Sequence, residues 1–116
     1  MDMQIKSSGS VRVFYPNYDT EWLVQEIRKK LEELNEKLST SMVVLFGSFA
    51  KRNYTVASDV DLLVVYKGEE KEDAYVIVKS ILDIPRLEPH VYSQREYEDM
   101  KGVISKMIEG GIVIGL

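Results

Sequence analysis

The residues of this chain best suited to chemistry are two aspartates separated by a single valine. Asp59 and Asp61 stand at the start of the apolar run from Val60 to Tyr66. Side chains two residues apart on a β-strand point to the same side, with Cα atoms about 7 Å apart. Two such carboxylates repel each other unless a cation compensates, and Mg²⁺ favours carboxylate oxygens together with substrate phosphates. The pair therefore indicates a Mg²⁺ site, and aspartates that merely cap the end of a strand are the alternative.

A glycine and a serine directly follow another apolar run, Met42 to Phe46. Gly47 has no side chain, so a phosphate oxygen can approach its backbone closely. Ser48 offers a hydroxyl donor, and a helix that begins at Phe49 would aim unpaired N–H groups at an anion. The turn is a candidate phosphate site, with an ordinary strand-to-helix turn as the alternative. Lys51 beside it either contacts the triphosphate or is simply solvated.

A third carboxylate, Glu88, opens the next apolar stretch, Leu87 to Tyr92. If that stretch is a strand adjacent to the Asp pair, Glu88 lies beside Asp61, and three carboxylates can hold two Mg²⁺ ions. One ion would activate an attacking hydroxyl and the other would neutralise the triphosphate. The alternative is that Glu88 is a surface residue flanked by Arg86. His90 follows two residues later and would face the same side, although a lone histidine is more often structural.

The elements that must position these groups follow from hydrophobic periodicity. We expect a small mixed β-sheet flanked by helices, an α/β (α+β) fold with three to five strands. Pro89 predicts that its strand lies at an edge or carries a bulge. The helix from residue 20 to 38 presents the apolar stripe Leu23, Ile27, Leu31, Leu34 and Leu38. The other predicted helices are 49–53, 69–82 and 94–109, and the predicted strands are 11–15, 42–46, 60–66, 87–92 and 112–116.

The composition narrows the class of protein. At 116 residues the chain suits one domain, which we place at 11–116 after a flexible N-terminus at 1–10. A net charge of −4 makes nucleic acid an improbable partner. The absence of cysteine is compatible with a cytoplasmic protein, and no stretch approaches the roughly 18 apolar residues of a membrane span.

Two segments together resemble the minimal nucleotidyltransferase family of the DNA polymerase beta-like superfamily. They are Leu45-Phe46-Gly47-Ser48-Phe49-Ala50-Lys51 and Ser58-Asp59-Val60-Asp61-Leu62-Leu63-Val64. The family pattern is a hydrophobic strand, Gly-Ser, a short basic segment and then Ser-Asp-x-Asp before hydrophobic residues, and the resemblance covers roughly residues 42–98. The resemblance implies a polymerase beta palm-like core. It also implies that Gly47, Ser48 and Lys51 bind nucleotide phosphates, and that Asp59, Asp61 and Glu88 bind metal and carry catalysis.

The chain departs from the family pattern at two places. Arg52-Asn53 stands where the family often has a glycine, and Glu88-Pro89 stands where it commonly has an aspartate. Glutamate reaches about one bond further than aspartate, so the metal geometry can differ.

The resemblance implies an enzyme that transfers a nucleoside monophosphate, AMP from ATP in the first instance, to a hydroxyl and releases pyrophosphate. Two Mg²⁺ ions and ATP or another NTP would be required. The implied acceptor is a HEPN-type helical partner protein, with this chain as the antitoxin of a toxin–antitoxin pair. A non-catalytic nucleotide- or partner-binding module and an antibiotic-modifying subunit, which would complete its acceptor pocket by homodimerisation, are the alternatives.

Overall fold

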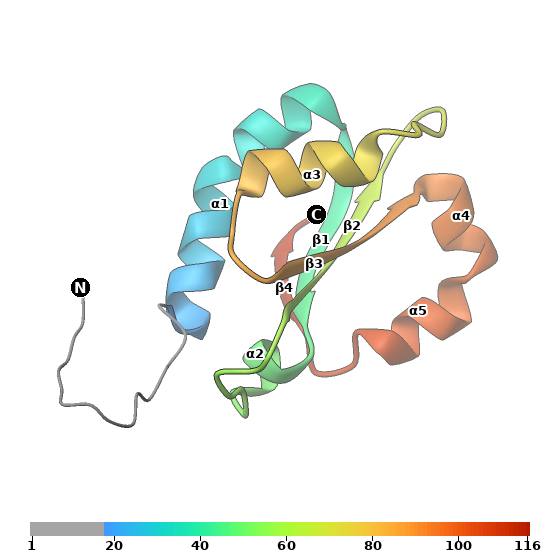
Figure 1. Ribbon diagram of the computed structural model, residues 1–116. Helices are drawn as coiled ribbons and strands as arrows, with labels where there is room; N and C mark the ends of the chain where they lie inside the picture. Colours follow the sequence, from blue (N-terminus) through green and yellow to red (C-terminus); the bar gives the residue numbers. More distant parts are fainter. Residues whose placement is uncertain (1–17) are drawn as a thin grey trace, which may run out of the picture.

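The computed structural model describes residues 18–116, and the predicted flexible segment 1–10 and strand 11–15 lie outside this range. A four-stranded sheet in the order β3-β2-β1-β4 forms the centre of the fold (Figure 1). Its strands are β1 (Thr40–Phe46), β2 (Val60–Tyr66), β3 (Leu87–Ser93) and β4 (Ile112–Gly115). β1 runs antiparallel to both β2 and β4, whereas β2 and β3 are parallel. The predicted mixed sheet is therefore confirmed, and Pro89 lies on an edge strand as expected.

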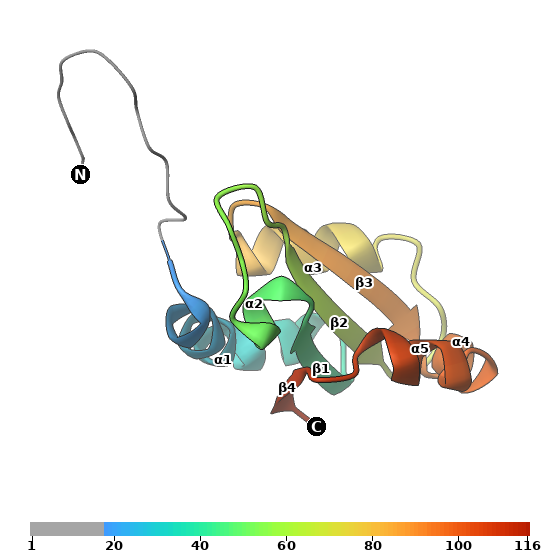
Figure 2. The ribbon, with the colours of Figure 1, turned by 90° about the horizontal axis from the view of Figure 1, so that it is seen from below.

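The helices lie on both faces of this sheet. One face carries α1 (Thr20–Lys37) and α3 (Ala74–Leu82), while α4 (Gln94–Asp99) and α5 (Lys101–Met107) pack on the other. The short α2 (Ser48–Lys51) follows β1 at one end of the sheet (Figures 1 and 2). No helix among residues 18–116 has the length and apolar character to cross a membrane.

The core consists of two hydrophobic clusters, one on each side of the sheet. The larger cluster joins the apolar stripe of α1 and the inner face of α3 to alternate residues of the strands. Leu23, Ile27, Leu34 and Leu38 are buried in it and Leu31 packs at its margin, as the period of the sequence predicts. The smaller cluster places Ile104 of α5 against Val44, Leu63 and Val65.

Two predicted helices differ from those observed. The helix expected from residue 69 begins at Ala74, because residues 69–73 offer no apolar side chain to the sheet and the Tyr66 hydroxyl accepts the Lys71 N–H. The helix expected over 94–109 is two helices that meet at Met100, whose φ of −115° and ψ of 18° break the regular turn. Met100 is 38% exposed at this break.

Phe49 ties α2 to the remainder of the fold, and its loss should be costly. Its ring is 1% exposed and stacks on Tyr54 with centroids 4.2 Å apart. We expect Phe49→Ala to lower the free energy of unfolding by about 3–5 kcal/mol, because it removes buried apolar area and leaves a cavity. Urea denaturation would measure this, with Val103→Ala at a 65% exposed position of α5 as the control. The control should change stability by less than about 0.5 kcal/mol, and equal losses in both variants would contradict this packing.

Candidate active site

The strand pairing brings the predicted site residues to one end of the sheet. β1 ends where β2 begins, and Phe46 is the register partner of Asp61. β3 runs parallel to β2 and so begins at the same end, with Glu88 as the partner of Asp61. Partners in a parallel pair project to the same face, so Asp61 and Glu88 stand side by side, next to the turn at Gly47. Figure 2 views the molecule from this end, where α2 and the loop that follows it surround the strands.

Gly47 and Asp61 are in close contact at the centre of this end. Gly47 has a φ of +79° and a ψ of −154°, a conformation essentially restricted to glycine. A Cβ on Gly47 would lie only 2.5 Å from Oδ2 of Asp61, so the carboxylate occupies the space that a side chain would fill. The glycine is therefore required both by the backbone turn and by the carboxylate beside it.

The other oxygen of the same carboxylate faces His90 of β3. Nε2 of His90 lies 3.4 Å from Oδ1 of Asp61, and both side chains are 31% exposed. An ionised carboxylate only accepts hydrogen bonds, so the contact requires the proton on Nε2. The imidazole also packs on Phe46 with ring centroids 5.0 Å apart. The orientation of Asp61 is thus fixed on one side by Gly47 and on the other by His90. The spacing of two residues from Glu88 predicts this shared face.

Asp59 occupies a different environment from Asp61. Its side chain is 56% exposed and accepts from the Arg86 guanidinium at 3.3 Å. Arg86 also donates to the carbonyls of Ala57 and Ser58, so one guanidinium holds the loop that leads into β2. The sequence places Arg86 only near Glu88, and its pairing with Asp59 becomes visible once β2 and β3 are known to be neighbours.

The three carboxylates are suitable ligands for a divalent cation, both in their chemistry and in their positions at the same end of β2 and β3. All are hard oxygen donors, and the absence of a Gly47 side chain leaves room for the Asp61 carboxylate beside the turn. Within residues 18–116 no three His, Cys, Asp or Glu side chains converge on one point, since Asp59 pairs with Arg86 and Glu88 is exposed. Binding of a cation by all three therefore requires their side chains to move closer together.

Of the residues predicted to bind phosphate, Ser48 lies beside Gly47 and Lys51 does not. Ser48 is the first residue of α2 and is half-buried beside Gly47. Lys51, at the last turn of α2, is exposed and extends along the Gly110 backbone, where an added Cβ would lie 3.5 Å from its Cε. The structure thus places Ser48 next to the Asp61 contact and turns Lys51 towards a different loop.

The departure from the family pattern at Arg52 has a visible consequence. Arg52 ends α2 with a φ of +59°, in the left-handed region that favours glycine. Its guanidinium pairs with Glu21 of α1 and holds the pKa of that carboxylate below its usual range. The chain accommodates the non-glycine residue and gains a link between α1 and α2.

Two further hydrogen bonds hold the start of α1 and the residues just before it, one to α2 and one to the loop that precedes β3. The buried Thr20 hydroxyl donates to the Phe49 carbonyl at 2.6 Å. The Tyr18 hydroxyl donates to the Pro85 carbonyl, and burial raises the pKa of Tyr18, which keeps the hydroxyl protonated as a donor. The turn that carries Gly47 and Ser48 is therefore supported by α1 as well as by the sheet.

Comparison with curated proteins gives a relative in Methanocaldococcus jannaschii that is named as a candidate protein adenylyltransferase. It is 40% identical over 40 residues, which cover 34% of this chain and 41% of the relative. The chain thus aligns with about two fifths of the length of that relative.

Solved structures with the same fold include a candidate nucleotidyltransferase of Sulfolobus solfataricus. Its TM-score is 0.52 at 17% identity, over 81% of this chain and 80% of that one. A chain in the complex of the tri-AMPylated HEPN toxin of Shewanella oneidensis with MNT antitoxin gives a TM-score of 0.54 at 16% identity, over 84% and 73% of the two chains. A toxin–antitoxin structure with AMP-PNP gives 0.52 at 18% identity, over 77% and 73%.

The decisive comparison is with models of protein families. The model described as nucleotidyltransferase domain matches residues 24–114, which include Gly47, Ser48, Lys51, Asp59, Asp61, Glu88 and His90. The order of strands, the Gly47 turn and the position of Asp61 agree with the sequence pattern that first indicated this family. The chain belongs to the nucleotidyltransferase domain family.

Proposed function

We propose that this chain transfers AMP from ATP to a hydroxyl group of a partner protein and releases pyrophosphate. The observation that carries the proposal is the contact between Asp61 and Gly47. It places a carboxylate suited to a metal directly beside the glycine of the turn after β1, on the strand next to Glu88. Membership of the nucleotidyltransferase domain family supports the reaction class.

Asp59, Asp61 and Glu88 are the residues that would hold Mg²⁺. Bound there, Mg²⁺ would supply charge neutralisation for the triphosphate and a lower pKa for the acceptor hydroxyl. The pairing of Asp59 with Arg86 then has a role before the nucleotide arrives, because the guanidinium compensates one carboxylate of a closely spaced pair.

The residues of the chain perform the remaining tasks. Gly47 admits the phosphates, Ser48 offers a hydroxyl donor to them, and Lys51 can reach them only by leaving Gly110. The acceptor oxygen forms a bond to the α-phosphorus as the bond to the bridging oxygen breaks, and pyrophosphate leaves. Glu88 is exposed on the strand next to Asp61 and is the group best placed to take the acceptor proton.

A protein acceptor is supported by two of the comparisons. The aligned relative is named for protein adenylylation, and one fold neighbour comes from a complex in which a HEPN toxin carries AMP. We therefore propose a HEPN-type helical protein as the acceptor, with this chain as its antitoxin. In such a pair, AMP on the toxin would be the product of the reaction.

A module that binds nucleotide without chemistry is the alternative, and one observation favours it. Arg86 already neutralises Asp59, so one of the three carboxylates has a protein partner in place of a metal. Two measurements separate the two functions. Calorimetry gives the affinity of the chain for Mg–ATP, and an assay in a lysate of the source cells gives the release of pyrophosphate. Our proposal expects both signals, with release abolished by EDTA. Binding without release would establish the module.

His90 should act on the rate through the orientation of Asp61. We expect His90→Leu to lower kcat by about tenfold with little change in KM for ATP, because the Asp61 carboxylate loses its only hydrogen-bond donor among the described side chains. His90→Gln offers an amide donor in place of the imidazole and should recover most of the rate. Steady-state kinetics of the two variants test this. Equal losses in both would show that His90 serves packing against Phe46 alone.

A further inference from the structure

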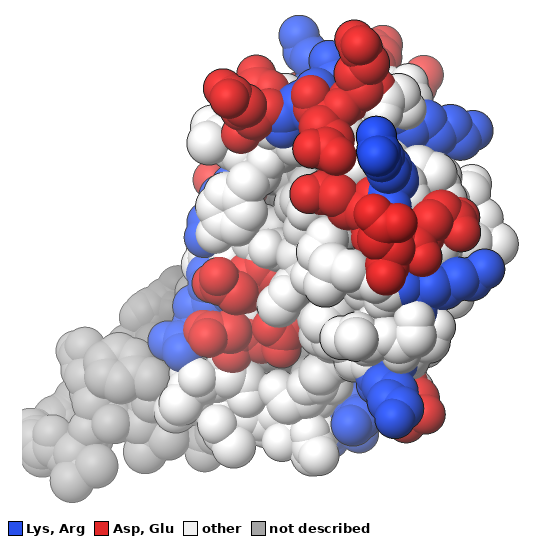
Figure 3. Space-filling model, turned by 90° about the vertical axis from the view of Figure 1, so that its right-hand side faces the viewer, with Lys and Arg blue, Asp and Glu red and all other residues white. Residues whose placement is uncertain are grey.

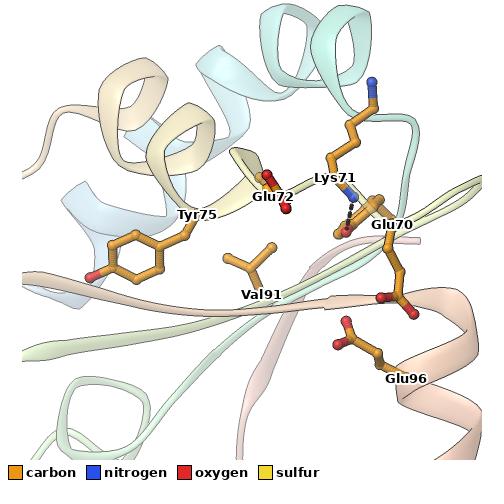
Figure 4. Close-up of a pocket in the computed structure, with 8 residues that line it drawn as sticks. Glu70, Lys71, Glu72, Tyr75, Val91 and Glu96 are labelled. Atoms are coloured by element: carbon orange, nitrogen blue, oxygen red, sulfur yellow. Dashed lines mark hydrogen bonds between the residues drawn. The ribbon is translucent and has the colours of Figure 1, made fainter.

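A second feature able to bind a ligand lies at the opposite end of the sheet from Asp61. It is a pocket of about 300 Å³ between the start of α3 and the edge strand β3 (Figure 4). Asp61 and Tyr66 are five residues apart on β2, which separates the pocket from the candidate active site by about 17 Å. The pocket is lined by Tyr66, Glu70, Lys71, Glu72, Ala74, Tyr75, Val91 and Glu96.

The charged groups around this pocket are mostly carboxylates. Figure 4 shows Glu70 and Glu96 directed towards each other, with Glu72 above Val91, while the Lys71 ammonium points away. Among the described residues none of these three glutamates has a basic partner within salt-bridge distance. The nearby Lys79 donates to the Leu87 carbonyl at 2.8 Å. Figure 3 shows acidic side chains gathered on the face of the molecule that carries α4. A cationic ligand would therefore be favoured here.

The backbone of β3 adds a second recognition element. The Val60 N–H donates to the Arg86 carbonyl, so residues 86, 88, 90 and 92 direct their backbone groups towards β2. Because backbone groups alternate in direction along a strand, residues 87, 89, 91 and 93 direct theirs away from the sheet, at its free edge. Three of these four positions are blocked. Leu87 bonds to Ile84 and Lys79, Pro89 has no N–H, and the Ser93 N–H donates to Glu96. Val91 alone presents both an N–H and a C=O, and it lines the pocket.

A buried hydroxyl completes the set. Tyr66 is 3% exposed, and its oxygen accepts the Lys71 N–H at 3.0 Å. None of the described residues accepts from the Tyr66 hydroxyl in return, although this group lines the pocket. The Tyr66 hydroxyl can therefore donate to a carbonyl oxygen of a ligand in the pocket.

We propose that this pocket docks an extended basic peptide segment of a partner protein. Its Arg or Lys side chain lies among Glu70, Glu72 and Glu96, and its backbone pairs with Val91 for a single residue. A peptide supplies the cation, the N–H and the carbonyl together, which neither a metal ion nor a simple amine does. The acidic lining repels nucleic acid. This site is independent of the transfer reaction proposed for Asp61.

Fluorescence anisotropy with a labelled, end-capped Gly-Val-Arg-Val-Gly peptide tests the proposal, with Gly-Val-Glu-Val-Gly as the matched probe. The arginine peptide should bind, binding should weaken as salt rises, and the glutamate peptide should not bind. In a nitrogen–proton NMR titration the Val91 amide should shift on addition of the arginine peptide. No binding of the arginine peptide, or equal binding of both peptides, would overturn the proposal.

Charge-matched variants locate the site. The double variant Glu70→Gln with Glu72→Gln should weaken binding of the arginine peptide by at least about tenfold, because two charge-assisted contacts are lost. Glu33→Gln with Glu36→Gln removes the same charge from the exposed face of α1 and should leave the affinity unchanged. Equal weakening in both double variants would show that only net charge attracts the peptide. The affinity for Mg–ATP should be unchanged in both double variants, whether or not they bind the arginine peptide.

Discussion

Replacing Asp61 by asparagine is expected to lower the rate of AMP transfer by at least about a thousandfold while the fold remains intact. Asparagine has nearly the same shape, so it can occupy the space beside Gly47 and accept from His90. What it lacks is the negative charge that a metal and its bound triphosphate require. Single-turnover measurement of pyrophosphate release would give the rate, and thermal denaturation would confirm the fold.

Asp83→Asn is the matched control for this loss. Asp83 ends α3 with a φ of +47°, which asparagine adopts readily, and α3 packs on the opposite face of the sheet from Asp61. The variant removes the same charge and should retain the full rate. If Asp61→Asn kept more than about a tenth of the activity, a central role for that carboxylate would be wrong.

Gly47→Ala should lower both stability and activity strongly. The added Cβ would stand 2.5 Å from Oδ2 of Asp61, in a backbone conformation that L-residues avoid. Strain and overpacking together should lower the free energy of unfolding by about 2–5 kcal/mol. Displacement of Asp61 should also abolish turnover. Denaturant titration and pyrophosphate release measure the two effects.

Two other glycines separate the causes of this destabilisation. Gly68 has a φ of +89° with no atom within 4 Å of an added Cβ, so Gly68→Ala should carry the strain alone, about 1 kcal/mol or somewhat more. Gly102 lies in α5 with open space around it, and Gly102→Ala should be neutral or stabilising by up to about 1 kcal/mol. If Gly47→Ala cost no more than Gly68→Ala, the close contact with Asp61 would not be significant.

The fold was largely predictable because its main elements have strong periodic patterns. The stripe of α1 and the continuous apolar strands β1 and β2 occur as expected, and β3, for which Pro89 predicts an edge position or a bulge, lies at an edge. The errors arose from local features that hydrophobic periodicity does not show. The Tyr66 hydroxyl binds Lys71 and delays α3, and the break at Met100 has no glycine or proline at that residue to announce it.

The site was predictable in position but not in its pairings. Gly47-Ser48 and Asp59-Val60-Asp61 indicate its residues, and the register of β2 with β3 brings Glu88 beside Asp61 as expected. The partners of each carboxylate depend on register and could not be derived from local sequence. Arg86 pairs with Asp59, and Asp61 is held between Gly47 and His90. The metal and phosphate roles of these residues stay predictions.

The central claim is transfer of AMP, and the position of the transferred label tests it most directly. The chain would be incubated with Mg²⁺ and a lysate of its source cells, once with α-labelled and once with γ-labelled ATP. We predict a labelled protein band from α-labelled ATP only, lost when Asp61→Asn replaces the native chain. Label from γ-labelled ATP, or no labelled band from any α-labelled nucleotide despite Mg–ATP binding, would contradict the proposed adenylyl transfer.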